Sequence, residues 1–204
     1  MLEMEIDGNI IVDLENYFNS KIITTKEQQQ ECRERFEFCG MRNQEWHMYD
    51  GNSLPGSGEV VVFKDVVFQF PNKDERHCDA ISCEGDIIEV QKDMYQRIYL
   101  FGAAFDECGG EEVFAIHYDS GKVEEKKIFM KEWYYLAANT KWDNPNSDII
   151  NSCVPVITAA HLSDSTKRCI YCVSIDVSQE NKVIAVELPF NPDIYIFGIT
   201  LGKK

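Results

Sequence analysis

Two stretches of the sequence combine tryptophan with amide and carboxylate side chains, which are the residue types that bind sugars. The stretches are QEWHMYDGNSLP and TKWDNPN. An aromatic ring can cover the apolar face of a sugar, while amides and carboxylates form hydrogen bonds with its hydroxyl groups. The candidate ligand-binding residues are Trp46, Tyr49, Asp50, Asn52, Trp142, Asp143 and Asn144.

The same residues also have a purely structural interpretation. Tryptophan and tyrosine in β-rich proteins commonly pack in the core or at its rim, and the pairs Asp50-Gly51 and Asp143-Asn144 are typical of turns. A buried indole would favour this second interpretation. An exposed indole in a groove would favour sugar binding.

The acidic pairs of the sequence do not predict a glycosidase. Two catalytic carboxylates must flank a glycosidic bond at a distance of roughly 5 to 10 Å. The candidate pairs are neighbours in sequence: Asp106-Glu107, Glu111-Glu112 and Glu124-Glu125. Adjacent side chains on a strand point to opposite faces, so we interpret these residues as solvated charges. No nucleophile triad or phosphate-binding loop is recognisable, and we assign no catalytic residue.

The histidines and cysteines likewise predict no metal site and no cofactor. His47, His77, His117 and His161 form no HExxH or HxH motif. His117 lies in a predicted strand, where we expect a cross-strand surface contact. His77 and His161 lie in predicted loops, so a loop-end cluster of these histidines with Cys78 or Asp79 stays open as an alternative.

The spacing of Cys169 and Cys172 resembles a metal-binding CxxC motif, but it falls within the strand-like run CIYCVSIDV. Residues three apart on a strand face opposite ways and cannot chelate one ion. The sequence has eight cysteines, and its N-terminus has neither a basic region nor an uninterrupted apolar stretch. We therefore expect an unprocessed, soluble, cytoplasmic protein whose eight cysteines are thiols.

Composition narrows the classes of partner. The net charge is −15, which disfavours nucleic acid and anionic membranes as partners. Hydrophobic residues make up 44% and aromatic residues 12%, enough for a sizeable core without cross-links. The acidity is compatible with a neutral partner such as a carbohydrate, another protein or a second copy of the chain.

Short β-rich runs separated by turns predict an all-β protein, an antiparallel two-sheet β-sandwich formed as one domain over residues 1–204. The runs are Ile10–Leu14, Glu59–Phe63, Val66–Phe70, Ile87–Val90, Arg97–Ala103, Glu112–Tyr118, Lys126–Met130, Cys169–Asp176, Val183–Leu188 and Ile194–Leu201. Only Thr25–Phe38 has a composition that could form a helix.

Turn residues support this pattern. Gly121 within Asp119–Lys122 supplies the positive φ of a tight hairpin, and Lys64-Asp65 is a second predicted hairpin tip. Pro71, Pro145, Pro189 and Pro192 are expected at or beyond strand ends. The polar stretch Ala138–Ser152 is predicted to be a loop, and the apolar final strand is predicted to pair inside a sheet.

An ordered set of segments resembles the β-sandwich module at the C-terminal end of bacterial α-mannosidase-type glycoside hydrolases and related carbohydrate-active proteins. The segments are VDLENYFNSKIIT, MYDGNSLP, VVFQFPNKDERHCDAISCEGDIIEV, MYQRIYLFGAAFDE, HYDSG, KWDN, AAHLSD and LPFNPDIYIFGITL. They extend over nearly the whole chain. The sequence departs from the module at Lys64-Asp65, where Gly-Gly is usual, and at Gly85-Asp86, where Gly-Gln is usual.

This resemblance implies a jelly-roll-like sandwich, similar to galactose-binding domains, that accompanies carbohydrate-active catalytic domains. It carries over no active site, because the catalytic groups of those enzymes lie in a separate domain. We therefore predict a stand-alone, intracellular, non-catalytic carbohydrate-associated binding module. The alternative is a protein-interaction or structural sandwich without a small-molecule ligand, and a glycoside hydrolase-related enzyme is the third hypothesis.

Overall fold

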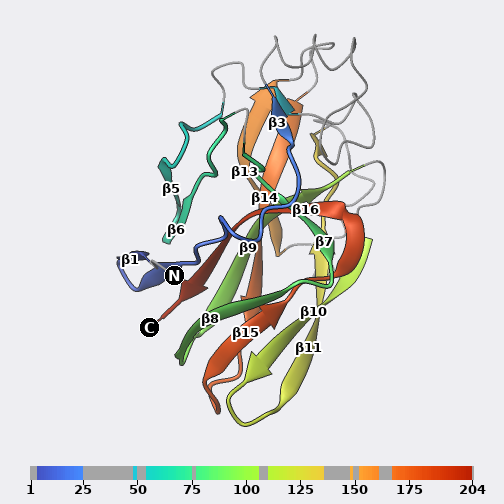
Figure 1. Ribbon diagram of the computed structural model, residues 1–204. Coiled ribbons are helices and arrows are strands. Elements are labelled where there is room, and N and C mark those ends of the chain that lie inside the picture. Colours follow the sequence, from blue (N-terminus) through green and yellow to red (C-terminus); the bar gives the residue numbers. More distant parts are fainter. Residues whose placement is uncertain are drawn as a thin grey trace.

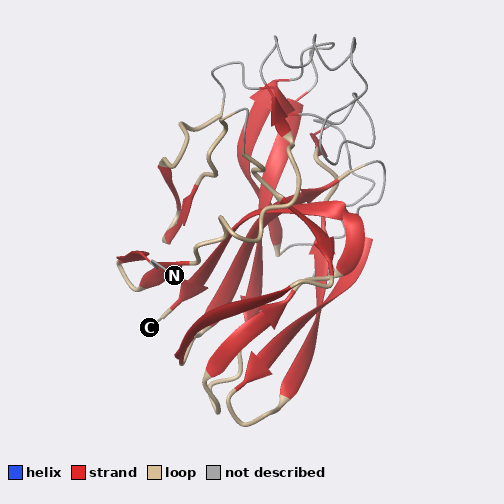
Figure 2. Cartoon of the chain, viewed as in Figure 1, coloured by secondary structure: helices blue, strands red, loops and turns tan. Residues whose placement is uncertain are grey.

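The computed structural model describes residues 4–24, 48–49, 54–74, 77–105, 110–135, 148, 152–160 and 167–203. The regular elements of these residues are strands (Figure 2). The predicted helix Thr25–Phe38 and most of the predicted loop Ala138–Ser152 lie outside the described residues.

The larger sheet has eight strands and forms the back of the sandwich (Figure 1). Its main path runs in the spatial order β1 (Met4–Ile6), β2 (Asn9–Ile11), β16 (Phe190–Gly202), β9 (Arg97–Ala104), β14 (Lys167–Asp176) and β12 (Tyr134–Tyr135). In addition β7 (Ile81–Glu84) pairs with β16, and β13 (Cys153–Ala160) pairs with β14. All these pairings are antiparallel.

The second sheet has four antiparallel strands. Their spatial order is β11 (Val123–Met130), β10 (Gly110–Tyr118), β15 (Val183–Glu187) and β8 (Ile87–Asp93). Alternation along β10 buries Phe114, Ile116 and Tyr118, while Val113 is half exposed. This period of two is expected for a sheet with one face on the core.

The core lies between these two sheets. Its buried cluster joins Leu100 and Ile199 of the larger sheet to Phe114, Ile116 and Val186 of the smaller one. The side chains of β-branched and aromatic residues fill the space between the layers, as expected for a sandwich. This arrangement confirms the predicted all-β, two-sheet antiparallel fold.

Two smaller pairs complete the described fold. The hairpin of β5 (Val60–Phe63) and β6 (Val66–Gln69) packs on the larger sheet. There Phe68 stacks on Phe101 with ring centroids 3.8 Å apart. The strands β3 (Ile23–Thr24) and β4 (Met48–Tyr49) form a short parallel pair.

Both predicted hairpin tips are confirmed. Gly121 has a φ of +82°, and its N–H donates to the carbonyl of Tyr118, which closes the β10–β11 turn. Lys64 has a φ of +57° at the β5–β6 tip, an unusual conformation for a residue with a side chain. The carbonyl of Asp65 in the same tip accepts a hydrogen bond from Asn9 at 3.0 Å, which anchors the tip to β2.

Some sequence predictions need correction. The prediction that Pro192 lies at or beyond a strand end is wrong, because Pro192 lies inside β16, where the pairing with β7 shifts register between Asn191 and Tyr195. An irregularity of this kind tolerates a residue without a backbone donor. The strand β2 ends at Ile11 rather than Leu14. The predicted runs do not include β7 and β13, nor the short strands β1, β3, β4 and β12.

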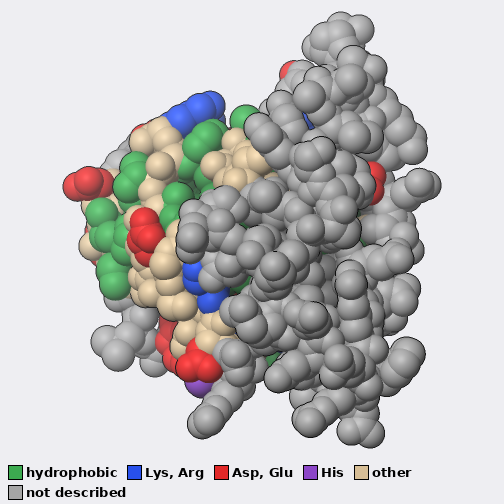
Figure 3. Space-filling view, turned by 90° about the horizontal axis from the view of Figure 1, so that it is seen from above, with side chains coloured by type: hydrophobic (Ala, Val, Ile, Leu, Met, Phe, Trp, Pro, Cys, Tyr) green, Lys and Arg blue, Asp and Glu red, His purple; other side chains and the backbone are tan. Residues whose placement is uncertain are grey.

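Acidic side chains are dispersed over the described surface. In the view of Figure 3, individual Asp and Glu side chains lie among apolar and neutral atoms. Several carboxylates elsewhere are paired, such as Asp119 with Lys92 at 3.0 Å and Asp93 with Lys203 at 3.0 Å. In the described part of this view, the acidic side chains are therefore dispersed rather than gathered in one patch.

A candidate ligand cavity

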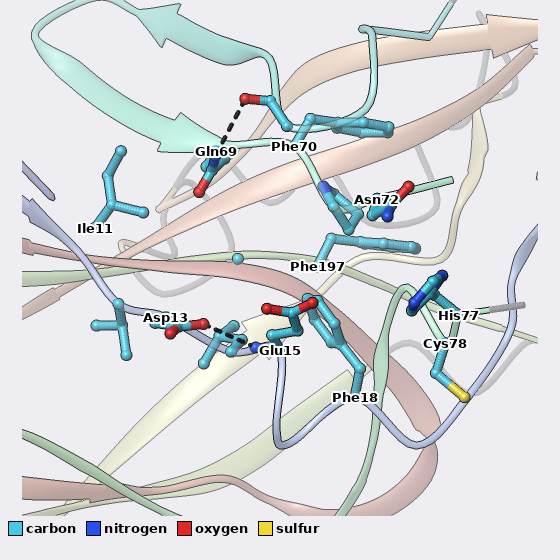
Figure 4. A pocket seen from close by; sticks show the side chains of 15 residues that line it. Ile11, Asp13, Glu15, Phe18, Gln69, Phe70, Asn72, His77, Cys78 and Phe197 are labelled. Atoms are coloured by element: carbon cyan, nitrogen blue, oxygen red, sulfur yellow. Dashed lines mark hydrogen bonds between the residues drawn. The ribbon is translucent and has the colours of Figure 1, made fainter. Parts of the chain in front are cut away.

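A cavity of about 330 Å³ lies where β2, β6 and β16 approach one another. Its wall is formed by three chain segments, by Gly58, and by Phe197 and Gly198 of β16. The segments are residues 11–18, 69–72 and 77–78. Figure 4 shows that side chains from all of them point toward the same space.

The first segment leaves β2 and supplies two carboxylates. Asp13 is half-buried and Glu15 is exposed at the cavity rim. The Asp13 Oδ1 atom accepts a hydrogen bond from the Glu15 backbone N–H at 3.1 Å (Figure 4). This local turn holds the segment in a defined shape, as Asx turns do after strands.

The second and third segments supply polar groups of other kinds. Gln69 and Asn72 are exposed amides, and the Gln69 Nε2 atom donates to the Gly58 carbonyl at 3.2 Å. His77 is exposed and Cys78 is half-buried on another side of the cavity (Figure 4). The cavity therefore offers hydrogen-bond donors and acceptors of several kinds.

Apolar side chains form the inner wall. Phe70 and Phe197 are buried and belong to this wall, and Leu14 is 4% exposed. Phe18 is the aromatic residue of the wall whose side chain is half-buried rather than fully enclosed. Its ring is the aromatic surface that a ligand could contact.

An ion pair beneath the cavity ties two of its segments together. Lys21 Nζ lies 2.7 Å from Asp79 Oδ2, and the two side chains are 4% and 0% exposed. Asp79 also accepts hydrogen bonds from the N–H groups of Ile22 and Ile23, while Lys21 donates to the Lys73 carbonyl. These bonds fix the chain after Phe18 against the chain after Asn72.

Two opposing effects act on Asp79. Burial raises its pKa to about 6, while Lys21 and the N–H groups of Ile22 and Ile23 favour the charged form. Burial removes the carboxylate from water, which disfavours its charged form. This effect is the larger of the two. Nearby, paired backbone bonds between Ser20 and Ala80 and two bonds between Asn19 and Ser82 continue the same contact.

The predicted sugar-binding residues lie almost entirely outside the described residues. This applies to Trp46, Asp50, Asn52, Trp142, Asp143 and Asn144. Tyr49 is the last residue of β4, where it pairs with Thr24 of β3. The two tryptophan stretches therefore stay a prediction.

The structure also places some of the histidines and acidic pairs considered above, while His47, His161 and the pair Asp106-Glu107 lie outside the described residues. His117 Nε2 lies 2.9 Å from Glu187 Oε2 on the neighbouring strand, which confirms the predicted cross-strand contact. Asp79 bonds Lys21 instead of joining His77 in a cluster. Glu111 bonds Lys127, whereas Glu112 bonds Asn191, so these neighbouring carboxylates have separate partners.

The described cysteines are thiols, as expected. They are Cys78, Cys83, Cys153, Cys169 and Cys172. Burial raises the pKa of Cys153 and Cys172 to about 12. Cys169 and Cys172 lie on β14, in agreement with the predicted strand. Within the described chain, no three His, Cys, Asp or Glu side chains gather as a metal site would require.

Sequence reasoning missed most of the cavity. Asp13 lies in the predicted strand Ile10–Leu14, and the polar and aromatic side chains of Glu15 and Phe18 follow it, which is the one local signal for this part of the wall. Nothing in the sequence shows that Gln69 and Asn72 lie beside these residues, because about fifty residues or more separate the segments.

In the described residues, no helix has the length and apolar character needed to span a membrane.

Comparison with known proteins agrees with this architecture. A search of curated proteins finds no match. The sequence profile of the AziU2-like beta-sandwich domain matches residues 8–204, nearly the whole chain. The match supports the β-sandwich part of the resemblance described above, while the α-mannosidase part stays a hypothesis. With its two antiparallel sheets and this match, the chain belongs to the AziU2-like beta-sandwich domain family.

Proposed function

We propose that this chain is a non-catalytic binding domain that takes a carbohydrate in the cavity. The observation that carries the proposal is the wall itself, which combines the carboxylates of Asp13 and Glu15, the amides of Gln69 and Asn72, and apolar surface. Recognition of a sugar requires this combination, because its hydroxyl groups need fixed polar partners and its ring faces are apolar.

The size of the cavity supports a small ligand. A volume of about 330 Å³ lies at the lower end of the range of roughly 300 to 1,000 Å³ that is typical of small-molecule sites. A monosaccharide or a short oligosaccharide end is therefore the class of carbohydrate we expect. The bonds between Lys21 and Asp79 preorganise two of the walls, which reduces the entropy lost on binding.

The placement of the carboxylates favours binding over hydrolysis. Asp13 and Glu15 are two positions apart on one segment, and the Asp13 side chain bonds the Glu15 backbone. A glycosidase that uses two carboxylates needs them on opposite sides of the bond that is cleaved. Hydrogen bonding to hydroxyl groups has no such requirement.

The test uses calorimetric titration and saturation-transfer NMR with glucose, galactose, mannose and their disaccharides. Asn72→Trp places a large side chain at the exposed rim of the cavity and should weaken binding about tenfold or more. Ser120→Trp is the matched control, because Ser120 is exposed at the distant β10–β11 turn. Binding that is equal in both variants would place the ligand elsewhere, and no binding by the wild-type protein would refute the proposal.

The tryptophan stretches are a second proposed location for the carbohydrate. Trp46→Ala or Trp142→Ala should weaken binding several-fold and leave the melting temperature nearly unchanged if the indoles stack on a sugar, since such contacts contribute on the order of 1 kcal/mol. A fall of many degrees would instead identify a core indole, because truncation of a buried large aromatic costs roughly 3 to 5 kcal/mol. Comparison with Asn72→Trp separates the two locations.

A further inference from the structure

The two carboxylates at the cavity rim have no cationic partner in the described part of the chain. Neither Asp13 nor Glu15 forms a salt bridge there, and Asp13 accepts only a local backbone bond. The nearest lysine in sequence, Lys21, is held by Asp79 and by the Lys73 carbonyl. The negative charge at the rim is therefore not neutralised by this lysine.

The rest of the described wall adds no permanent positive charge. None of the described residues that line the wall is a lysine or an arginine. They lie within residues 11–18, 58, 69–72, 77–78 and 197–198. Gln69, Asn72 and Cys78 are uncharged in their ordinary forms, and His77 is a cation only when it is protonated. Among the described wall residues, the carboxylates of Asp13 and Glu15 are the permanent charges, so a cationic group would find complementary charge here.

We infer that the carbohydrate bound in this cavity carries a protonated amine, as an amino sugar does. This inference rests on the proposed function. It goes further because it names the chemical group that distinguishes the ligand from other sugars. Charge-assisted hydrogen bonds from an ammonium group to Asp13 and Glu15 would be shorter and stronger than those of neutral hydroxyl groups.

The positions of the labelled side chains suggest how such a ligand would lie. Figure 4 shows Asp13 and Glu15 on one side of the cavity and Gln69 and Asn72 on the other. The ammonium group would lie at the carboxylate side, and the ring hydroxyls would face the amides. Phe18, on the same segment as the carboxylates, adds an aromatic surface, and aromatic faces attract cations.

The experiment compares sugars that differ at one group. Glucose, glucosamine and N-acetylglucosamine are titrated into the full chain in a buffer that contains no primary amine. Acetylation removes the positive charge but keeps the sugar ring. Glucosamine should bind about tenfold more tightly than glucose, whereas N-acetylglucosamine should lose that advantage. The preference should shrink as the salt concentration rises, because the carboxylates are near the surface.

Two double variants assign the preference to the cavity. Asp13→Asn with Glu15→Gln removes both rim charges, and it should abolish the preference for glucosamine while glucose still binds. The control is Glu89→Gln with Glu125→Gln, which removes the same net charge from exposed positions outside the cavity. The control should keep the preference. Circular dichroism and melting curves verify that both variants are folded.

The outcomes separate this inference from the proposed function. Equal affinity for glucose and glucosamine, or a preference that survives Asp13→Asn with Glu15→Gln, would overturn the inference and leave carbohydrate binding intact. If ethanolamine and putrescine bind through the same two carboxylates while no sugar binds, the carbohydrate proposal is wrong and the cationic site stands. If none of these compounds binds, both proposals are refuted.

Discussion

At the scale of single residues, the contact between Lys21 and Asp79 is the most consequential one described. Both charges are buried, and together they satisfy the Ile22 and Ile23 N–H groups and the Lys73 carbonyl. Desolvation of two charges offsets much of their attraction, so such a pair adds little net stability. Loss of one partner, in contrast, leaves an uncompensated charge in the interior.

This asymmetry predicts strong coupling between the two positions. Lys21→Met should lower the free energy of unfolding by about 3 to 5 kcal/mol, because the Asp79 carboxylate would stay buried without its counter-charge. Addition of Asp79→Asn should recover part of that loss, since the introduced amide oxygen could still accept the backbone bonds. Urea unfolding of both single variants and the double variant gives the coupling energy. Purely additive losses would contradict this account.

The same carboxyl group predicts a pH dependence. Its pKa is raised to about 6 in the folded protein and is near 3.8 without burial, so the folded state binds the proton more tightly. The resulting stabilisation is fully present below the unfolded pKa and is lost as pH rises through about 6. Relative to Lys21→Met with Asp79→Asn, the wild-type protein should therefore gain stability between about pH 7 and pH 5, by up to roughly 1.4 kcal/mol per unit. If the difference in unfolding free energy between the wild-type protein and this double variant stays constant from pH 7 to pH 5, Asp79 does not titrate in that range.

At the scale of elements, turn geometry sets the pairing of the strands. Gly121 has a φ of +82°, in the left-handed region that favours glycine, and a Cβ there would meet nothing within 4 Å. Gly121→Ala therefore tests backbone conformation alone and should cost about 1 kcal/mol. Gly110→Ala is the matched control, because a Cβ at Gly110 likewise meets no described atom within 4 Å and its φ is not positive. The measurement is the melting temperature of each variant. An equal fall in both would refute the role of the positive φ at Gly121.

Close approach of two strands predicts a larger effect at Gly102. A Cβ added to this residue of β9 would lie 2.5 Å from the Tyr195 carbonyl oxygen of β16. Because that atom belongs to the backbone, the paired strands would have to move apart. Gly102→Ala should therefore destabilise the protein by about 1 to 3 kcal/mol, the usual range for overpacking. A melting temperature equal to that of the wild-type protein would contradict the close contact.

At the scale of the whole molecule, the buried thiols report on global unfolding. Cys83, Cys153, Cys169 and Cys172 are buried, and burial raises the pKa of the Cys153 and Cys172 thiols to about 12. Reaction requires the thiolate, so these residues should resist alkylation in the native protein while Cys78 reacts faster. After denaturation without reductant, mass spectrometry should count all eight cysteines as labelled. A shortfall in pairs would show disulfides and contradict the expected reducing environment.

The sequence determined most of the strands because their signal is local. The β-rich run Glu112–Tyr118 and the apolar content of Ile194–Leu201 predicted β10 and most of β16, and Gly121 predicted the hairpin between β10 and β11. The strand β13 was missed because its sequence includes Pro155. That residue is tolerated beside a register shift in a strand that pairs with β14 alone among the described strands.

Tertiary structure decided where the cavity lies. In the sequence, Asp13 lies at the end of the predicted strand Ile10–Leu14 and Glu15 just beyond it. Gln69 lies at the end of the predicted strand Val66–Phe70 and Asn72 just beyond it. They share one cavity because β2 and β6 both lie beside β16, with contacts between residues that are far apart in sequence. A pattern within one segment cannot show that two segments lie side by side in the fold. The free energy that brings them together comes from packing of the apolar strands that precede them.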